Sequence, residues 1–267
     1  MGDSVMMVLR LSIGYCYRLM MTGSLLSFFI FMATNLLTAE DLPSWSYDGA
    51  VNGPSTWGRL HPSYELCKEG DQQSPLSITA PTLTKDDLSP VINYRLDAFR
   101  FRDSGLHSYF IPQSKQSLQF QFQSYDFGFI RVHTPAEHQV LSQRFPVSFQ
   151  LHHRAESGEK LVVVILFVHG AEDTIDMEPF LTLLNEKDNP KKKDSFNMNQ
   201  LFLDHHRFYH YRGSMTVPPC DEETHWLIVN QPVVISQDSF LAFKKMRQFN
   251  ANNRPLQVQG KRVISLL

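Results

Sequence analysis

The stretch Lys160-Leu161-Val162-Val163-Val164-Ile165-Leu166-Phe167-Val168 is almost entirely apolar after its first residue. Strands that are buried on both faces of a sheet have this character, because neither row of alternating side chains meets water. A strand that faces water on one side would alternate apolar and polar residues instead. The sequence therefore predicts a fully buried β-strand over residues 160–168.

Further strands are predicted on both sides of this run. In residues 116–123, Gln-Ser-Leu-Gln-Phe-Gln-Phe-Gln, the apolar residues alternate with polar ones, so Leu118, Phe120 and Phe122 would share one face of a strand. The other stretches with strand character are Phe127–His133, Phe145–His153 and Trp226–Ile235. Strands therefore dominate the predicted fold.

Helices are predicted only at the periphery. The two segments with helical character are short, Pro179–Asn185 and Ser239–Phe249, and Asp238 is a candidate N-cap for the second. The chain also contains 20 Phe residues, which favours an aromatic-rich β core over a helical bundle.

Composition limits the classes of function. The chain has 267 residues, of which 42% are hydrophobic and 19% charged, as in an ordinary globular protein with a sizeable core. Its net charge of −2 offers no general attraction to nucleic acid or to an anionic membrane. No repeat or low-complexity linker divides the chain, so one domain is expected over residues 40–267.

Residues 1–39 have the pattern of a secretory signal peptide. Arg10 and Arg18 precede the apolar stretch Leu19–Leu37, and Ala39 is a small residue at a plausible cleavage point. The apolar run is also long enough to remain as an uncleaved signal anchor. We therefore expect a secreted protein or one in the lumen of the secretory pathway, with a membrane-anchored form as the alternative.

Cysteine usage agrees with export. Cys16 lies in the leader, which leaves Cys67 and Cys220 in the mature chain. In an oxidising compartment two cysteines suggest one disulfide, and closing a loop of about 150 residues would stabilise the fold by roughly 5 kcal/mol. Two separate buried thiols are the alternative.

Several motifs follow one another along the chain in a recognisable order. They are Trp45-Ser46-Tyr47-Asp48-Gly49, Asn52-Gly53-Pro54, Trp57-Gly58, Gln73-Ser74-Pro75-Leu76-Ser77-Ile78, His133-Thr134-Pro135-Ala136-Glu137-His138, Gly213-Ser214-Met215-Thr216-Val217-Pro218-Pro219-Cys220 with Trp226, and Arg254-Pro255-Leu256-Gln257. In this order and register they resemble the motifs of the α-carbonic anhydrases. The resemblance implies a twisted, mostly antiparallel sheet of ten strands, with short peripheral helices and a central active-site cone. It also places Cys67 and Cys220 where secreted members carry their disulfide.

The resemblance implies a zinc site that has lost its ligands. The family holds zinc with three neutral imidazoles, two of them in a His-x-His pair on one strand and the third on the neighbouring strand. The three positions here are Arg131, His133 and Gln150. Arginine has no lone pair to donate, and its charge repels a metal dication. Phe129 and Ser148 stand where the family has groups that support the first and third ligands. Some animal carbonic anhydrase-related proteins, regarded as catalytically silent, have a similar triplet.

Other parts of the family's site are present. Glu137 and Thr216 match the pair that orients the zinc hydroxide, and without zinc we expect their hydrogen bond to hold two strands together. His107 lies near the position of the family's proton shuttle, and we expect it at the surface or at the rim of the cone.

The sequence leaves two questions about the cone open. His152 shares a strand face with Ser148 and Gln150, so a substitute metal site from His133, Gln150 and His152 is conceivable. Arg131 argues against it, as does the step of about 6–7 Å between alternate strand residues. Arg131 itself could pair with Glu137 or hold a small anion.

The sequence thus predicts a non-catalytic binding or scaffold module in which the scaffold motifs are kept and the zinc chemistry is lost. We expect no cofactor, a monomer, and a partner that is another protein or an extracellular ligand, without nucleic acid. The alternative is a zinc-dependent carbonate dehydratase, which hydrates carbon dioxide reversibly, with an altered ligand set.

Overall fold

The computed structural model describes residues 42–84, 89–185, 194–203, 206–246, 248 and 250–267, and residues 44–267 form one compact unit. The predicted signal peptide, residues 1–39, lies outside the described residues. Within the described part, no helix has the length and apolar character needed to cross a membrane.

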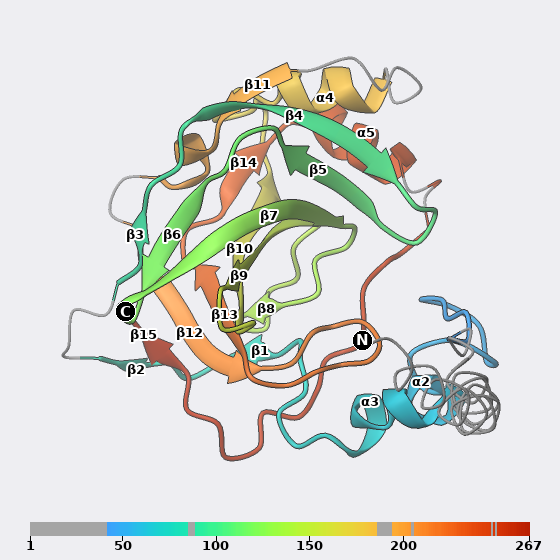
Figure 1. The fold of residues 1–267 in the computed structure, drawn as a ribbon. Helices are drawn as coiled ribbons and strands as arrows, with labels where there is room; N and C mark the ends of the chain where they lie inside the picture. The colour runs from blue at the N-terminus through green and yellow to red at the C-terminus, as the bar shows by residue number, and fades with distance from the viewer. Residues whose placement is uncertain (1–41, 85–88, 186–193, 204–205, 247, 249) are drawn as a thin grey trace, which may run out of the picture. The chain divides into compact units, whose positions relative to one another are not determined.

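The described part of the chain contains more strand than helix (Figure 1). The strands are β1 (Ser77–Ile78), β2 (Thr82–Leu83), β3 (Val91–Ile92), β4 (Leu96–Asp103), β5 (Ser108–Pro112), β6 (Ser117–Phe120), β7 (Gln123–His133), β8 (Gln139–Val140), β9 (Val147–Ala155), β10 (Lys160–His169), β11 (Asp194–Asn197), β12 (Phe208–Gly213), β13 (Thr224–Val229), β14 (Val233–Ile235) and β15 (Ser265–Leu266). The helices are α2 (Trp57–Leu60), α3 (Leu66–Glu69), α4 (Glu178–Asn185) and α5 (Gln237–Met246), with short 3₁₀ turns at Pro62–Tyr64 and Met198–Leu201.

One large sheet organises these elements. A path of ten strands runs in the order β11-β4-β5-β7-β9-β10-β13-β12-β15-β2, and β3, β6 and β14 pair alongside it to complete a 13-stranded sheet. Most neighbours are antiparallel, while β10 runs parallel to both β13 and β14. The mostly antiparallel ten-stranded sheet that the resemblance implied is therefore confirmed as the main path of a larger sheet.

The apolar run at residues 160–168 forms β10, which lies near the middle of this path. Every residue from Leu161 to Phe167 is almost completely buried, as predicted. The strand predicted at 127–133 lies within β7, and the one predicted at 145–153 overlaps β9, which begins two residues later, at Val147. The predicted strand Trp226–Ile235 is instead two strands, β13 and β14, because Asn230-Gln231-Pro232 interrupts it and Pro232 has no N–H for a ladder.

The prediction of one strand over residues 116–123 is wrong. The chain turns back at Gln121 and Phe122, whose φ angles are 48° and 64°, so that β6 and β7 form a hairpin with Phe120 paired to Gln123. Leu118 and Phe120 are buried, whereas Phe122 is fully exposed at the turn. Alternation alone could not locate this turn, because the sequence lacks the Gly or Asn that usually marks one.

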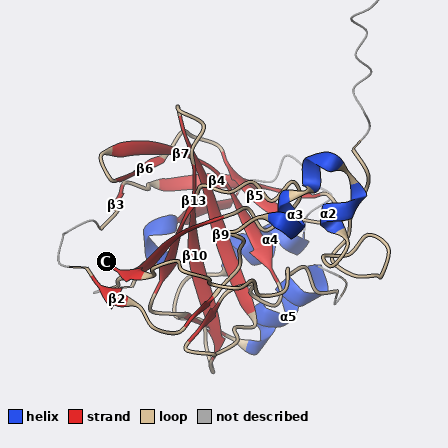
Figure 2. Ribbon diagram, turned by 90° about the horizontal axis from the view of Figure 1, so that it is seen from below, coloured by secondary structure: helices blue, strands red, loops and turns tan. Residues whose placement is uncertain are grey.

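The two faces of the sheet carry different cores. One face packs against α4 and α5 through aromatic side chains, among them Phe149, Phe180 and Phe243. The opposite face carries a smaller apolar cluster around Val162, Val164 and Trp226. The helices lie at the margins of the strand array (Figure 2), as the sequence predicted.

The predicted disulfide is confirmed. Cys67 and Cys220 are bonded across a separation of 153 residues. The bond packs with Trp57 and Tyr64 in a third apolar cluster, and it therefore ties the N-terminal helices to the loop before β13.

Helix α5 begins two residues earlier than the sequence indicated, so Asp238 is not its cap. Ser236 precedes the helix, and its Oγ accepts a hydrogen bond from the backbone N–H of Ser239 at 3.2 Å. Asp173 fixes the position of Ser236, because Oδ1 of Asp173 accepts from the backbone N–H of Ser236 at 2.7 Å. Ser236 is therefore the N-cap of α5, because its hydroxyl accepts from a backbone N–H of the first turn.

We expect Ser236→Ala to lower the free energy of unfolding by about 1 kcal/mol, because the first turn loses its cap. Asp238→Ala is the matched control, since the aspartate lies within the first turn without capping it. Urea denaturation of both variants measures the difference. Equal losses in the two variants would contradict the assignment of the cap.

Candidate functional site

Six side chains from β7 and β9 share the face of the sheet opposite α4 and α5. The strands pair so that three residues of β7 lie directly across from three of β9. The pairs are Phe129 with His152, Arg131 with Gln150, and His133 with Ser148. We call these six residues the cone cluster. The alternation of side chains along paired strands therefore brings the three ligand positions of the family together.

His133 is held as a metal-binding histidine would be. Its Nδ1 lies 2.6 Å from the backbone oxygen of Asn252, and a carbonyl can only accept, so Nδ1 carries the proton. The side chain of Asn252 in turn accepts from the N–H of Thr134 and donates to the oxygen of Val132, both at 2.8 Å. This ligand position therefore has an outer partner of the kind that orients metal-binding histidines.

The side-chain amide of Gln150 is hydrogen-bonded to the buried carboxylate of Glu137. Nε2 of Gln150 donates to Oε2 of Glu137 at 2.7 Å, and the backbone N–H of Arg254 donates to Oε1 at 2.9 Å. Thr216 Oγ1 is buried without a hydrogen-bond partner in the described structure. The expected hydrogen bond between Glu137 and Thr216 is therefore wrong. The amide at position 150 reaches the carboxylate and replaces the threonine.

Arg131 is a buried cation without a carboxylate partner. Its side chain is only 6% exposed, and its Nε and Nη1 find no acceptor among the described residues. Its guanidinium carbon lies 5.6 Å from the ring centre of Tyr109 and 5.6 Å from that of Phe129. The pairing of Arg131 with Glu137, one of the two options left open by the sequence, does not occur.

His152 belongs to a stack of rings rather than to a second metal site. Its ring lies 4.6 Å from that of Phe129 at an interplanar angle of 22°. Burial, with Arg131 as the next cause, lowers its pKa well below 6.5, so the imidazole is neutral at pH 7. His152 is two pairing steps from His133, about 13 Å along the strands, and the pair Arg131–Gln150 stands between them. The three residues His133, Gln150 and His152 therefore do not converge as a ligand set.

His107 is buried, so of the two expected positions, at the surface or at the rim of the cone, an exposed surface position does not occur. It is 6% exposed and lies against the rings of Trp45, Tyr47 and Tyr109. Its Nε2 lies 2.8 Å from the hydroxyl of Tyr47. The N-terminal aromatic residues cover this histidine, a tertiary contact that its position in the sequence could not reveal.

The side chains at the three ligand positions do not fit a catalytic zinc ion. Such an ion takes three protein donors and leaves a fourth position for water. Here only His133 offers an imidazole, and Arg131 offers no lone pair. Gln150 could offer only its amide oxygen, which has no partner among the described residues but is not one of the usual ligands of zinc. In the part of the chain that the structure describes, no group of three or more His, Cys, Asp or Glu side chains is placed to hold a metal.

Two residues of the site were not predicted from the sequence. Asn252 was not singled out, although it orients His133 through its backbone oxygen. Arg254 was recognised only as part of the closing motif, yet its backbone N–H holds Glu137. Both lie more than a hundred residues from their partners, so no local pattern could have indicated the contacts.

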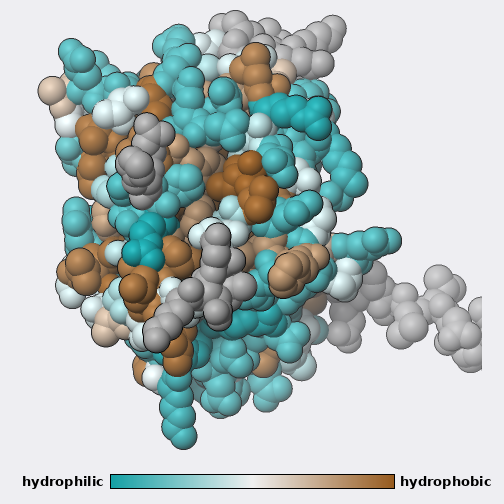
Figure 3. Space-filling view, turned by 90° about the vertical axis from the view of Figure 1, so that its left-hand side faces the viewer, coloured by the Kyte–Doolittle hydropathy of each residue, from teal (hydrophilic) through white to brown (hydrophobic). Residues whose placement is uncertain are grey.

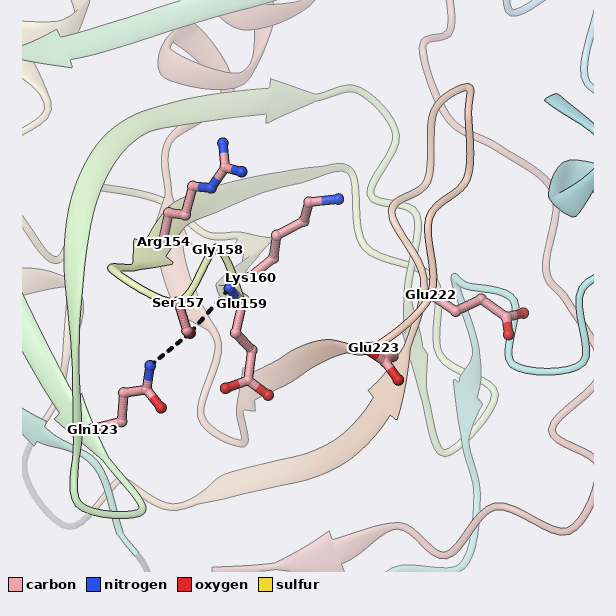
Figure 4. A pocket seen from close by; sticks show the side chains of 8 residues that line it. All are labelled: Gln123, Arg154, Ser157, Gly158, Glu159, Lys160, Glu222 and Glu223. Carbon is pink, nitrogen blue, oxygen red and sulfur yellow. Dashed lines mark hydrogen bonds between the residues drawn. The ribbon is translucent and has the colours of Figure 1, made fainter. Parts of the chain in front are cut away.

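A surface pocket of about 650 Å³ lies away from the cone cluster (Figure 4). Its lining residues are Gln123, Arg154, Ser157, Gly158, Glu159, Lys160, Glu222 and Glu223. Both signs of charge are present, and several of the side chains already have partners: Gln123 donates to Ser157 at 2.9 Å, and Lys160 donates to Asp221 at 2.6 Å. None of the residues that the family motifs indicated lines this pocket.

Comparison with known proteins agrees with the fold and the arrangement of motifs. The family model for the eukaryotic-type carbonic anhydrase matches residues 52–266. Dioscorin dioA3 from Dioscorea japonica is 34% identical over 244 residues, which is 87% of this chain and 89% of that protein. A crystal structure of dioscorin complexed with ascorbate has a TM-score of 0.75 at 29% identity, covering 84% of this chain and 98% of that one. The α-carbonic anhydrase of Thermovibrio ammonificans with the inhibitor sulfanilamide has a TM-score of 0.73 at 27% identity, covering 83% and 98%. The chain therefore belongs to the eukaryotic-type carbonic anhydrase family.

Proposed function

We propose that this protein is a carbonic anhydrase-related binding module that does not hydrate carbon dioxide. Hydration in the family needs a zinc-bound water that ionises near neutrality. The side chains at the ligand positions cannot supply the three donors that such an ion requires. The fold is kept, so its role is to bind a ligand or partner.

The observation that carries this proposal is the rearranged hydrogen bond of Glu137. In the family this carboxylate acts on the zinc hydroxide through the threonine that Thr216 matches. Here its two oxygens accept from Gln150 and from the backbone of Arg254. The glutamine at a ligand position thus also engages the carboxylate that would orient the nucleophile, which supports loss of the reaction as a whole.

The cone is a better candidate for ligand binding than the surface in Figure 3. On that face, apolar side chains are scattered among hydrophilic ones, which is ordinary for the exterior of a folded protein. A dioscorin has been solved in complex with ascorbate, which supports the idea that this fold can serve binding of a small molecule. The disulfide supports a place in the secretory pathway or outside the cell.

We expect the purified protein to hydrate carbon dioxide no faster than buffer, and to contain substoichiometric zinc after dialysis against a zinc-containing buffer. Stopped-flow hydration with and without acetazolamide, together with elemental analysis, measures both quantities. An active α-carbonic anhydrase treated in parallel is the positive control. Stoichiometric zinc together with sulfonamide-sensitive turnover would establish the alternative, a carbonate dehydratase with an altered ligand set.

Secretion has a separate test. Expression of the whole chain in a eukaryotic cell is expected to release protein whose N-terminus begins close to residue 40. N-terminal sequencing of the released protein checks this. Retention of the protein in the membrane fraction with residues 1–39 still attached would favour the signal anchor instead.

A further inference from the structure

Two arginines among the described residues are buried, and they differ in their hydrogen-bond partners. The guanidinium of Arg254 donates to oxygens of Gln73, Ser74 and Cys67 at 2.8–2.9 Å. Arg131 is nearly as well buried, yet its Nε and Nη1 have no acceptor in the described structure. A guanidinium keeps its charge in proteins, and an uncompensated buried charge is strongly destabilising. No described residue therefore serves as a counter-ion for Arg131.

Neighbouring groups offset only part of this cost. The rings of Tyr109 and Phe129 each lie 5.6 Å from the guanidinium carbon, and cation–π contacts are weaker than the desolvation penalty of an ion. The nearby carboxylate of Glu137 has both oxygens engaged by Gln150 and Arg254. Among the described residues, no carboxylate is therefore left to pair with Arg131.

The surroundings define the kind of anion. Arg131 contributes one positive charge, because a guanidinium stays protonated in proteins. The opening at Arg131 is small, since Arg131 and His152 are 6% and 7% exposed. Aromatic rings of Tyr109 and Phe129 form the adjacent walls. One charge, little room and apolar walls favour a small organic monoanion over a hydrated dianion such as sulfate.

We propose that the cone cluster binds a small monovalent carboxylate through the guanidinium of Arg131. Nε and Nη1 are buried, so the accessible part of the group is its Nη2 side. There the carboxylate accepts a charge-assisted hydrogen bond, which is stronger than a neutral one. The anion thus sits where the family places its metal, with the arginine supplying the positive charge. This inference rests on the proposed function, because a zinc ion and the anion would occupy the same place.

The test uses the disulfide-bonded protein in chloride-free buffer at constant ionic strength, with formate and acetate as probes. Isothermal titration calorimetry is expected to show saturable binding of one anion per chain. The melting temperature should rise with anion concentration, because a ligand that binds only the folded state stabilises it. Chloride and sulfate are titrated in the same way. Saturation by chloride or sulfate with the affinity of formate would overturn the assignment to carboxylates.

Arg131→Met removes the charge and keeps a long side chain. It should weaken formate binding by at least about tenfold, the lower end of what a charge-assisted hydrogen bond contributes. Arg154→Met is the matched control, because Arg154 lies exposed on the same strand, β9, that carries Gln150 and His152. It should leave the affinity unchanged. Equal affinity in wild type and Arg131→Met would show that the anion binds elsewhere or adventitiously, and would overturn the proposal.

Arg131→Lys covers the case in which the methionine variant does not fold. The lysine keeps the charge but presents an ammonium in place of the planar guanidinium, so formate binding should persist and be weaker. Affinity unchanged from wild type would overturn the role of the guanidinium. Hydration assays on the same samples separate the two proposals. Turnover with bound zinc would refute the proposed function, whereas absence of both turnover and carboxylate binding would refute only the anion site.

Discussion

The double variant Arg131→His with Gln150→His is expected to bind one zinc ion per chain, with an affinity several orders of magnitude above that of the natural protein. Residues 131 and 150 face each other directly across β7 and β9, and His133 lies two residues along the same strand face. The change therefore places three imidazoles together and removes the cation between them. It also releases Glu137 from the amide of residue 150, so the carboxylate becomes available to Thr216.

Affinity should still fall short of an intact site. Phe129 and Ser148 stand at the positions of two supporting groups, and each missing partner costs about 10- to 100-fold in metal affinity. Zinc titration against a competing chelator measures the gain, with the two single variants as controls. Adding Phe129→Gln and Ser148→Glu should raise the affinity further. Failure of the double variant to bind zinc would show that the ring stack of Phe129 and His152 blocks the site. The residues at positions 131 and 150 would then be insufficient to explain the loss of metal.

Arg254→Met is expected to lower the free energy of unfolding by about 3–5 kcal/mol, because several buried acceptors lose their donor at about 1–3 kcal/mol each. The guanidinium joins Gln73, Ser74 and Cys67, and it also lies 5.7 Å from the ring centre of Trp57. Burial lowers the pKa of Arg254 to about 10, so the group is still charged at pH 7. The variant removes the donor shared by these segments.

Arg131→Met is the matched control, since it removes a guanidinium that is nearly as well buried but whose Nε and Nη1 have no acceptor among the described residues. In buffer free of carboxylates we expect it to be neutral or stabilising, because replacing an uncompensated buried ion by an apolar chain relieves its desolvation cost. Guanidinium chloride denaturation of both variants at pH 7 measures the difference. Similar losses of stability in both would contradict the claim that Arg131 is unpaired within the protein.

The strand framework could be predicted from the sequence to different degrees. The run at 160–168 has no polar interruption, so it predicted β10 without ambiguity. The stretch at 116–123 alternates equally well, yet it contains a turn at Gln121 and Phe122. Alternation reports which faces side chains would occupy if the chain stayed extended. It does not report whether the chain stays extended, and here the pairing of β6 with β7 decided that.

The functional site, like the strands, could be predicted from the sequence only in part. The identities of Arg131, His133 and Gln150 on neighbouring strands followed from motif and spacing, and the pairing of β7 with β9 agrees with them. The partners of their polar atoms did not follow. Gln150 was considered as a member of a substitute metal site, and its amide nitrogen instead donates to Glu137. His107 was expected at the surface or at the rim of the cone, and it is buried against Trp45 and Tyr47.

The sequence by itself determined the family, the sheet, the disulfide and the chemical types at the three ligand positions, because each of these depends on local pattern or on motifs in order. Only the tertiary structure decided which hydrogen bonds form in the cone cluster and that Arg131 has no counter-ion among the residues that the structure describes. A buried polar group takes whichever partner lies within about 3 Å with suitable geometry, and that depends on the packing of segments more than a hundred residues apart.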